Sequence, residues 1–451
     1  MKLVYNVKDK PKAGQLIVFA FQQLLAILAA TIVVPVIVGN GMAQSAALFG
    51  AGIGTIVYQL FTKFRSPVFL GSSFAFLGSM AAAFAGAVSA QAGYAGLIFG
   101  AAFAGLVYVV IALVVKFAGV KWIDKLMPKQ VIGPTVAIIG LSLAGSAISD
   151  LQTGKYFVNG AATVDTHIAI LCGLITLFVV MICSVYGKKT AKLIPFIIGI
   201  VAGYAVAAIF TVIGIKTNND ALKVIDFGAF KDMTFFALPD FTFVEAYKGI
   251  KDIDGAYIAS IAVAYIPVAL VVFAEHIADH KNLSSIIEKD LLEDPGLHRT
   301  LLGDGIGSMV GAFFGGCPNT TYGESIGCVA ITGNASVITI VATAIIAMLI
   351  SFFSPFIVFL SSIPNCVMGG VCMALYGFIA VSGLKMVQKV DLEDNRNLFV
   401  VSVILIAGIG GLSLTFGDVE ANKAITITAV ATALILGIIA NIVLNRKKAN
   451  A

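Results

Sequence analysis

Charged side chains are scarce in this sequence: Asp, Glu, Lys and Arg make up only 12% of its 451 residues, whereas hydrophobic residues make up 59%. A soluble domain has about 25% charged residues, so this shortage excludes a water-soluble globular protein. Apolar runs long enough to cross a hydrocarbon core of about 30 Å as one helix recur from end to end. The sequence therefore predicts an all-α polytopic membrane protein without a soluble domain.

Motifs for catalysis and for cofactor binding are absent as well. The sequence has no Ser–His–Asp order, no phosphate-binding loop and no cysteines at metal-ligand spacing. Its six cysteines lie in or beside apolar segments and are interpreted as small core residues: Cys172, Cys183, Cys317, Cys328, Cys366 and Cys372. We therefore predict neither an enzyme nor a bound cofactor or metal. The net charge of +5 indicates membrane topology rather than nucleic-acid binding.

Hydropathy divides the chain into fourteen predicted spans or half-spans. They cover about residues 15–38, 45–62, 68–88, 92–116, 130–148, 168–186, 192–215, 255–280, 300–316, 320–333, 335–360, 365–384, 397–414 and 424–445. The longest polar connections are predicted at Thr217–Lys251 and His280–Arg299. With the N-terminus inside, 22 of the 29 Lys and Arg residues fall in cytoplasmic segments and 7 fall on the other side. The positive-inside rule then places both termini in the cytoplasm.

A short internal repeat relates the two halves of the chain. The segments MPKQVIGPTVAIIGLSLAGSA from Met127 and IPNCVMGGVCMALYGFIAVSG from Ile363 share the pattern P-x-x-V-[IM]-G, with their prolines 236 residues apart. In the span count the first copy enters from inside and the second from outside. Seven spans per half therefore predict two inverted repeats, which are typical of many secondary transporters.

Two of the predicted spans, 68–88 and 320–333, are interrupted by polar sequence. The first begins with SPVFLGSSFAF from Ser66 and the second with CPNTTYGES from Cys317. Each has a proline, then residues that favour extended backbone, then small residues that could begin a half-helix. Irregular backbone is tolerated at membrane depth only against protein or a water-filled cavity, where helix N-termini can hold a polar solute. Glu324, inside the second segment, is therefore a candidate binding residue.

Other ionisable residues within the spans are few. The segment AEHIADH from Ala274 places Glu275 and Asp279 one helical turn apart on the same face. That spacing suits one carboxylate that contacts a substrate and a second group that exchanges a proton with it. A carboxylate at the bilayer centre costs at least about 2.5 kcal/mol, so it normally has a partner or a function.

The position of these acids in the membrane depends on where the helix ends. If the span ends at Ala274, Glu275 is an ordinary acid at the cytoplasmic edge; if the helix continues through Leu283, Glu275 moves inward. His276 and His280 could face the cytoplasm, which is the interpretation favoured for His280. Asp304, in GDGIG, could be a helix-start acid near the inner surface or a functional residue.

Taken together, these motifs resemble the nucleobase–ascorbate transporter family, also called nucleobase–cation symporter 2, and especially its bacterial uracil permeases. The resemblance covers essentially the whole chain. It is strongest in FQQLLAILAATIVVPVIVG, FLGSSFAF, AEHIADH, DLLEDPGLHRTLLGDG, PNTTYGESIGCVAIT and MGGVCMALYG. The family signature [QE]-N-x-G-x-x-x-x-T is matched from Glu324 to Thr332, with Ser325 in place of the asparagine.

The resemblance implies a fold of fourteen spans with short antiparallel strands in spans 3 and 10. It implies a core domain formed by residues 1–124 and 220–362, and a gate domain formed by residues 125–219 and 363–451. The nucleobase would bind between the two domains. A homodimer in the bacterial cytoplasmic membrane is also implied.

The resemblance further implies the residues of the site. Glu275 and Glu324 match the two substrate-binding glutamates of the family. The other matching positions line the base pocket or lie beside it: Phe74, Tyr322, Gly323, Ala30 and Tyr376. Proton coupling is expected to involve Glu275, Asp279 and Asp304.

The family pattern favours a proton-coupled uracil importer, with a xanthine or other purine symporter as the alternative. Glu324 is of the uracil type, but Asp279 stands where the uracil branch typically has a histidine. Asp279 and Asp304 are more like the purine-transporting branches. An anion exchanger of the same architecture is a further alternative. It would need a basic group aimed at the site. The two interrupted spans, 68–88 and 320–333, contain no Lys or Arg.

Overall fold

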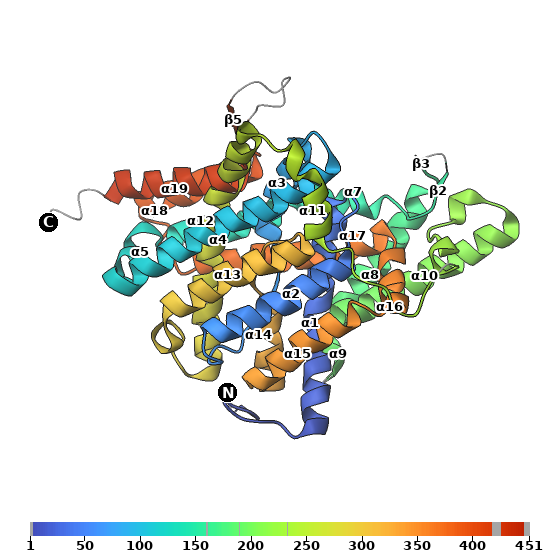
Figure 1. Ribbon diagram of the computed structural model, residues 1–451, viewed down its shortest axis with the longest axis horizontal. Coiled ribbons are helices and arrows are strands. Elements are labelled where there is room, and N and C mark those ends of the chain that lie inside the picture. Colours follow the sequence, from blue (N-terminus) through green and yellow to red (C-terminus); the bar gives the residue numbers. More distant parts are fainter. Residues whose placement is uncertain (1–2, 159–160, 189, 232, 417–424, 446–451) are drawn as a thin grey trace.

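Helices make up nearly all of the computed structural model of this chain, which describes residues 3–158, 161–188, 190–231, 233–416 and 425–445 (Figure 1). The helices are α1 (Ala13–Val38), α2 (Gln44–Phe61), α3 (Leu77–Ala85), α4 (Ala90–Ala118), α5 (Lys121–Leu126), α6 (Lys129–Ser142), α7 (Ala144–Leu151), α8 (Thr166–Tyr186), α9 (Thr190–Leu193), α10 (Pro195–Thr217), α11 (Thr242–Gly249), α12 (Gly255–Ile287), α13 (Leu297–Gly315), α14 (Gly323–Thr332), α15 (Val337–Ile350), α16 (Ser354–Ser362), α17 (Asn365–Val387), α18 (Asn395–Ile409) and α19 (Ala429–Asn445). The strands form three two-stranded antiparallel pairs: β1 (Leu70–Ser72) with β4 (Asn319–Thr321), β2 (Phe157–Val158) with β3 (Ala161–Ala162), and β5 (Leu414–Phe416) with β6 (Ile425–Ile427).

The long helices confirm a polytopic membrane protein. Within the described residues, seven helical segments are long and apolar enough to cross a membrane: Ala13–Val38, Ala90–Ala118, Lys129–Leu151, Thr166–Tyr186, Pro195–Thr217, Gly255–Ile287 and Asn365–Val387. Shorter apolar helices lie in four of the other predicted spans: Phe74–Ala85, Val337–Ile350, Asn395–Ile409 and Ala429–Asn445. Of the charges used to predict topology, Lys2, Lys189, Lys423 and Arg446–Lys448 lie outside the described residues.

Two predicted boundaries are wrong. The span predicted at 335–360 is interrupted between α15 and α16, where Phe353 is extended. In a continuous helix Pro355 would lack the amide hydrogen for Ser351 O and its ring would clash with that carbonyl, whereas the first turn of α16 tolerates it. The amide groups of the break bond to a neighbouring segment, since Ala237 N donates to Phe352 O at 3.1 Å and Ser354 N donates to Phe235 O at 3.2 Å. The connection predicted to begin at His280 begins later, because α12 continues to Ile287.

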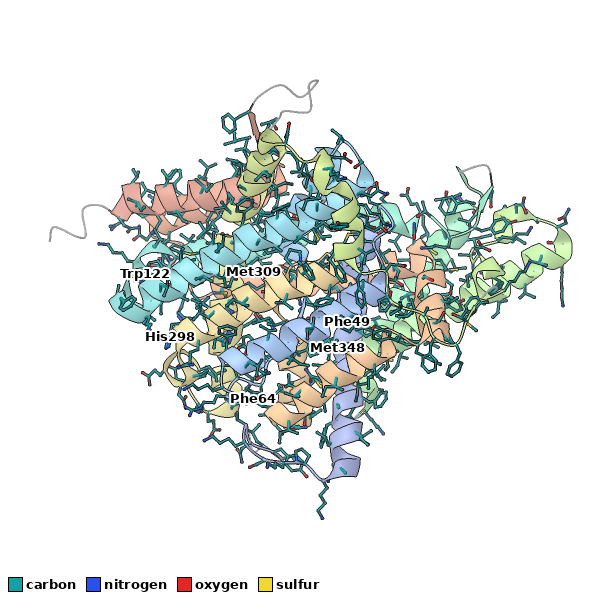
Figure 2. All side chains as sticks on the ribbon, viewed as in Figure 1. Phe49, Phe64, Trp122, His298, Met309 and Met348 are labelled. Carbon is teal, nitrogen blue, oxygen red and sulfur yellow. The ribbon has the colours of Figure 1, made fainter. Side chains whose placement is uncertain are left out.

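The helices pack in two groups. In the first, α13 packs against α2 and α4, and α15 packs against α1 and α2, so that α2, α4 and α13 lie side by side in Figure 1. In the second, α17 packs against α6, α7 and α8, and α18 packs against α6 and α19. Glycines let methionines fill the first group closely: a Cβ at Gly52 would meet Met348, and one at Gly105 would meet Met309 (Figure 2).

Asp294 connects two loops outside the helices through an ion-pair cluster. Its carboxylate lies 2.7 Å from Arg65 Nη1 and 2.6 Å from Lys289 Nζ, with 42% of the side chain exposed. The hydrogen bonds from Lys289 and Arg65 lower the pKa of Asp294 to about 2. Its stabilising contribution is therefore present above the unfolded-state pKa of about 3.9 and is lost as the pH falls through 2.

We expect Asp294→Asn to lower the free energy of unfolding by less than about 1 kcal/mol at neutral pH, because exposed ion pairs contribute little. Thermal unfolding of detergent-purified protein would measure this difference from the wild type. The difference should shrink as the pH is lowered from neutral toward 2. A difference that grew with acidity would contradict a lowered pKa for Asp294.

Candidate functional site

Strands β1 and β4 meet in the middle of the structure, although they come from opposite halves of the chain. They pair antiparallel, with Leu70 opposite Thr321, Gly71 opposite Thr320 and Ser72 opposite Asn319. This pairing confirms the short strands expected in the interrupted spans.

Hydrogen bonds between polar side chains and backbone groups join α2 to these strands. Leu70 N donates to Thr55 Oγ1 at 2.9 Å, and Gln59 Nε2 donates to the carbonyls of Ser66 and Val68 at 2.9 and 3.0 Å. Asn319 Nδ2 donates to the α2 carbonyl of Gly50 at 3.0 Å. Such partners are needed because backbone groups without water must be paired inside the protein.

A helix begins directly after each strand. β1 leads through Ser73 into a short 3₁₀ turn at Phe74–Phe76 and then α3, and β4 leads through Tyr322 into α14. The Tyr322 hydroxyl donates to Ser72 O at 2.8 Å, and its ring occupies the space that a Cβ at Gly71 would need. The glycine is therefore required for the aromatic ring to lie against the strand.

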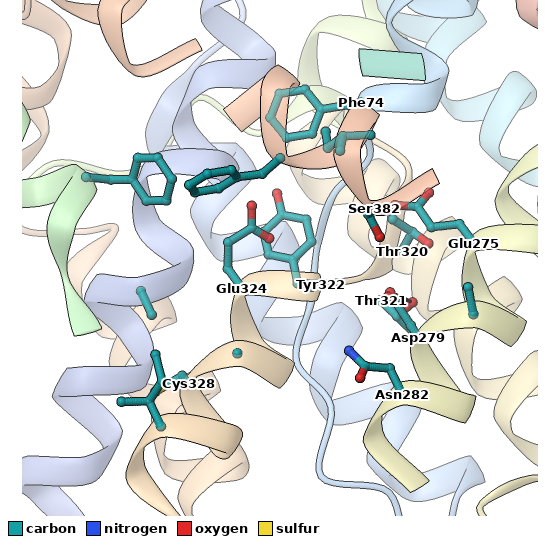
Figure 3. A pocket seen from close by; sticks show the side chains of 18 of the residues that line it. Phe74, Glu275, Asp279, Asn282, Thr320, Thr321, Tyr322, Glu324, Cys328 and Ser382 are labelled. Carbon is teal, nitrogen blue, oxygen red and sulfur yellow. Dashed lines mark hydrogen bonds between the residues drawn. The ribbon is translucent and has the colours of Figure 1, made fainter. Parts of the chain in front are cut away.

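A cavity of about 430 Å³ opens beside the strand pair (Figure 3). Its lining comes from α1, α6, α8, α9, α10, α12, α14 and α17 as well as from the strand region. The lining residues are Ala26, Phe74, Val136, Ser184, Lys192, Pro195, Phe196, Glu275, Ala278, Asp279, Asn282, Thr320, Thr321, Tyr322, Gly323, Glu324, Gly327, Cys328, Ile331, Phe378, Ile379 and Ser382. Both helix groups therefore contribute to one cavity.

Most residues predicted for the site lie in this lining: Glu275, Asp279, Glu324, Phe74, Tyr322 and Gly323. Figure 3 shows Glu275 of α12 and Glu324 of α14 on opposite sides of the cavity. Glu275 lies inside α12, which continues to Ile287, so the inward alternative for this acid is the one that the structure supports. In the described part of the chain, no other side chain hydrogen-bonds to either glutamate, which leaves both carboxylates available to a ligand.

Three predicted residues lie outside the lining. Tyr376 of α17 makes an edge-to-face contact with Phe74, with ring centroids 5.7 Å apart, so it supports a lining residue. Ala30 is buried on α1, one helical turn beyond the lining residue Ala26. Asp304 is 1% exposed and packs behind the wall of the cavity, against His276.

The prediction that His280 faces the cytoplasm is wrong. His276 and His280 are both 0% exposed, on the face of α12 that points into the first helix group. His276 Nδ1 lies 2.7 Å from Asp304 Oδ2, and His280 Nε2 lies 2.8 Å from the Tyr58 hydroxyl. The apolar positions after His280 keep the helix buried for two more turns, and this places both imidazoles inside the protein.

Hydrogen bonds fix the acidic face and the start of α14. Thr321 Oγ1 of β4 donates to Asp279 Oδ2 at 2.7 Å. Ser325 is buried and accepts from Gln23 Nε2 at 2.5 Å and from Phe69 N at 3.2 Å. Although Ser325 replaces the asparagine of the signature, its hydroxyl still connects α1, the first interrupted span and α14.

Several lining residues were missed by sequence reasoning. Asn282 follows Asp279 by three positions on the same face of α12, a spacing that could have identified it. Ser382 and Phe378 of α17 and Phe196 of α10 carry no local signal, because only the packing of the second helix group brings them to the cavity.

The cavity offers three kinds of contact to a small polar ring. Its carboxylates can accept hydrogen bonds from ring N–H groups, and the amide groups at the start of α14 can donate to carbonyl oxygens. Phe74 and Tyr322 provide flat apolar surface. Lys192 is the one Lys or Arg in the lining within the described residues, and no group of three His, Cys, Asp or Glu side chains in that part of the chain could hold a metal ion.

Comparison with known sequences relates this chain to one family of membrane proteins. The sequence profile of the permease family matches residues 14–417. The uracil permease of Bacillus caldolyticus is 38% identical over 445 residues, which cover 98% of this chain and 95% of that protein. The uracil permease of Escherichia coli strain K12 is 34% identical over 417 residues, covering 92% of this chain and 89% of that protein.

Comparison with solved structures concerns the fold alone. The transmembrane domain of the cyanobacterial bicarbonate transporter BicA superposes with a TM-score of 0.62 at 16% identity, covering 95% of this chain and 97% of that one. The inward-facing murine anion transporter Slc26a9 superposes with a TM-score of 0.62 at 11% identity, covering 98% and 69%. The helical architecture is therefore shared with membrane transporters of different sequence.

Proposed function

Because this chain belongs to the permease family of nucleobase–ascorbate transporters, we propose that it imports uracil in symport with protons. The chain is a multi-pass membrane transporter rather than an enzyme. Sequence identity of 38% and 34% to two uracil permeases, over 98% and 92% of this chain, supports uracil as the substrate. The observation that carries the proposal is the placement of two glutamates, Glu275 and Glu324, on opposite sides of one cavity.

Uracil fits the chemistry of these groups. It has two ring N–H donors, N1–H and N3–H, between carbonyl acceptors, and an ionised carboxylate only accepts hydrogen bonds. Glu275 and Glu324 accept from ring N–H groups on different edges of the base. The amide groups at the start of α14 donate to a carbonyl oxygen, and Phe74 packs nearby.

Alternating access follows from movement of one helix group against the other. In this proposal the fourteen spans form two inverted repeats of seven, both termini are cytoplasmic, and the protein is a homodimer. The core domain carries the strand pair and Glu275, and the gate domain carries α17 with Phe378 and Ser382. Because the cavity has walls from both groups, their relative movement would open it to one side of the membrane at a time.

Proton coupling is assigned to the acids of α12 and α13. Glu275 contacts the base and exchanges its proton together with Asp279, which lines the same cavity one turn away. Asp304 takes part from behind the cavity wall. Acids close enough to interact titrate together, so the coupling proton belongs to the group rather than to one residue.

A purine substrate is the alternative within the family, and it is favoured by Asp279 and Asp304. Anion exchange is the alternative suggested by the architecture alone. A single exposed lysine, Lys192, in a lining with three carboxylates is a poor site for an anion.

Uptake into proteoliposomes tests the proposal. An inward proton gradient should drive accumulation of labelled uracil, and excess unlabelled uracil should compete better than xanthine. Bicarbonate and sulfate should not compete. If uptake of labelled uracil did not depend on the proton gradient, symport would be contradicted. If xanthine competed better than uracil, the purine function would be assigned instead.

Asp279→Asn separates binding from coupling. The variant keeps a side chain of the same size that can still bond to Thr321, so we expect exchange of bound uracil to survive better than uphill accumulation. Both activities would be measured in the same vesicles, with the exposed Asp290→Asn as a control that changes neither. Equal loss of exchange and accumulation would contradict a coupling role for Asp279.

A further inference from the structure

Behind the cavity wall, α12 has a second polar face. Whereas Glu275 and Asp279 line the cavity, His276 and His280 point the other way, with stacked rings whose centroids lie 4.0 Å apart. His280 Nδ1 donates to the carbonyl of His276 at 2.8 Å. The helix thus presents acids to the cavity and imidazoles to the interior of the first helix group.

The hydrogen bonds of His276 fix the number of protons on it and its partner. Thr300 Oγ1 donates its proton to Leu297 O at 3.0 Å, so the same oxygen accepts from His276 Nε2–H, also at 3.0 Å. The 2.7 Å contact between His276 Nδ1 and Asp304 Oδ2 must then contain one proton. His276 and Asp304 are together either a neutral imidazole with a carboxylic acid or an imidazolium with a carboxylate. Both forms have zero net charge.

The neutral form is the resting one. Asp304 Oδ1 is buried and has no hydrogen-bond partner in the described part of the chain. An ionised carboxylate with one bare oxygen in this environment would carry a large desolvation cost, whereas the carbonyl oxygen of a carboxylic acid carries a smaller one. At rest, Asp304 Oδ2–H therefore donates to His276 Nδ1.

We propose that His276 and Asp304 form a proton-sharing pair that offsets the charge of Glu275 each time Glu275 loses its proton. His276 follows Glu275 directly on α12. Asp304 of α13 contacts the His276 ring on the side away from the cavity. When Glu275 ionises, the shared proton moves from Asp304 Oδ2 to His276 Nδ1, so that an imidazolium forms on the residue that follows Glu275 in α12 and the matching negative charge lies on Asp304 of α13. When Glu275 is protonated again, the proton returns to Asp304, and no proton leaves the pair.

The surroundings of the pair contain no competing cation among the described residues that contact it. The titratable groups that face it are Tyr108 of α4, Tyr58 of α2 and His280 of α12, and the acids on the cavity side of α12 are Glu275 and Asp279, with Glu324 of α14 across the cavity. Tyr108 lies edge-on to His276, with ring centroids 6.2 Å apart, and its hydroxyl has no partner in that part of the chain. Of the two imidazoles in this set, His276 is the one that follows Glu275 directly and that contacts a carboxyl group.

Infrared spectroscopy of the purified protein tests the pair without any substrate. The wild-type spectrum should contain the C=O band of a protonated carboxylic acid that disappears in Asp304→Asn and shifts in His276→Asn. Identical bands in wild type and Asp304→Asn would overturn the proposal. If Asp304→Asn does not fold, His276→Asn decides: an unshifted band would overturn the pair.

The offsetting role rests on the proposed proton-coupled uptake and has its own readout. Without the pair, nothing offsets the negative charge of ionised Glu275, so Glu275 keeps its proton to a higher pH. The alkaline limb of the uptake–pH curve should therefore move to higher pH by about one pH unit in Asp304→Asn or His276→Asn. The double variant should move it no further. His280→Asn is the matched control, since it removes a buried imidazole that contacts Tyr58 rather than an acid, and it should leave the curve in place.

The two proposals fail in different ways. Wild-type protein that shows the Asp304 band but no proton-driven uptake would overturn symport and leave the shared proton established. Wild-type uptake that is proton-driven, with unshifted curves in both single variants, would overturn the offsetting role. A shift as large in His280→Asn would also overturn it, because the effect would then be one of packing.

Discussion

Replacing Glu275 with glutamine is expected to lower proton-driven uracil uptake by at least about 100-fold, because it removes a charge-assisted hydrogen bond and a titratable group together. Glutamine has nearly the same size, so the cavity and the packing of α12 are retained. Its amide keeps one acceptor oxygen, replaces the other with an N–H donor and cannot exchange a proton. The measurement is the initial rate of labelled uracil uptake into proteoliposomes under an imposed proton gradient.

The matched control is Glu293→Gln, which makes the same chemical change at an exposed position outside the cavity. It should transport like the wild type. Glu275→Gln protein that is folded and retains full proton-driven uptake would show that Glu275 neither binds the base nor takes part in coupling.

Replacing Gly71 with alanine is expected to disrupt the binding region through sterics alone. An alanine Cβ would overlap the Tyr322 ring, so either the ring or the β1–β4 pair must move. Overpacking of this kind costs about 1–3 kcal/mol. Since Tyr322 stands directly before α14, its displacement also moves Glu324, and we expect uracil affinity to fall about tenfold for each 1.4 kcal/mol of binding free energy lost.

Gly377→Ala is the control for this prediction. Gly377 lies on α17, and an added Cβ there would meet nothing within 4 Å. Affinity would be measured by titration calorimetry and stability by thermal unfolding. Wild-type affinity in Gly71→Ala would mean that the packing of Tyr322 against β1 does not position the site.

The interrupted spans were predictable because their signal is local. Proline, extended-prone residues and small residues stand together in an apolar background, and these features alone locate β1, β4 and the start of α14. Glu324 was found for the same reason. The position of Glu275 was not settled locally, because it depends on whether α12 continues past Ala274, and burial of Leu283 and Ile287 in the tertiary structure decides that.

Other parts of the site depend on contacts that no single segment encodes. His280 is buried because Tyr58, 222 residues earlier in the chain, provides a partner for its ring. Phe196 and Phe378 reach the cavity only when α10 and α17 pack together. The position of Asp304 behind the wall likewise follows from how α13 packs against α2 and α4, so its sequence context GDGIG could not distinguish a lining residue from a supporting one.

Binding of nucleobases to the purified protein tests the central claim most directly. A ligand that binds the native state raises the melting temperature, so unfolding would be measured with uracil, xanthine and sulfate at matched concentrations. We predict stabilisation by uracil, a smaller effect of xanthine and none of sulfate, and we expect Glu324→Gln to lower the uracil effect. Stabilisation by sulfate or xanthine without stabilisation by uracil would contradict a uracil site between Glu275 and Glu324.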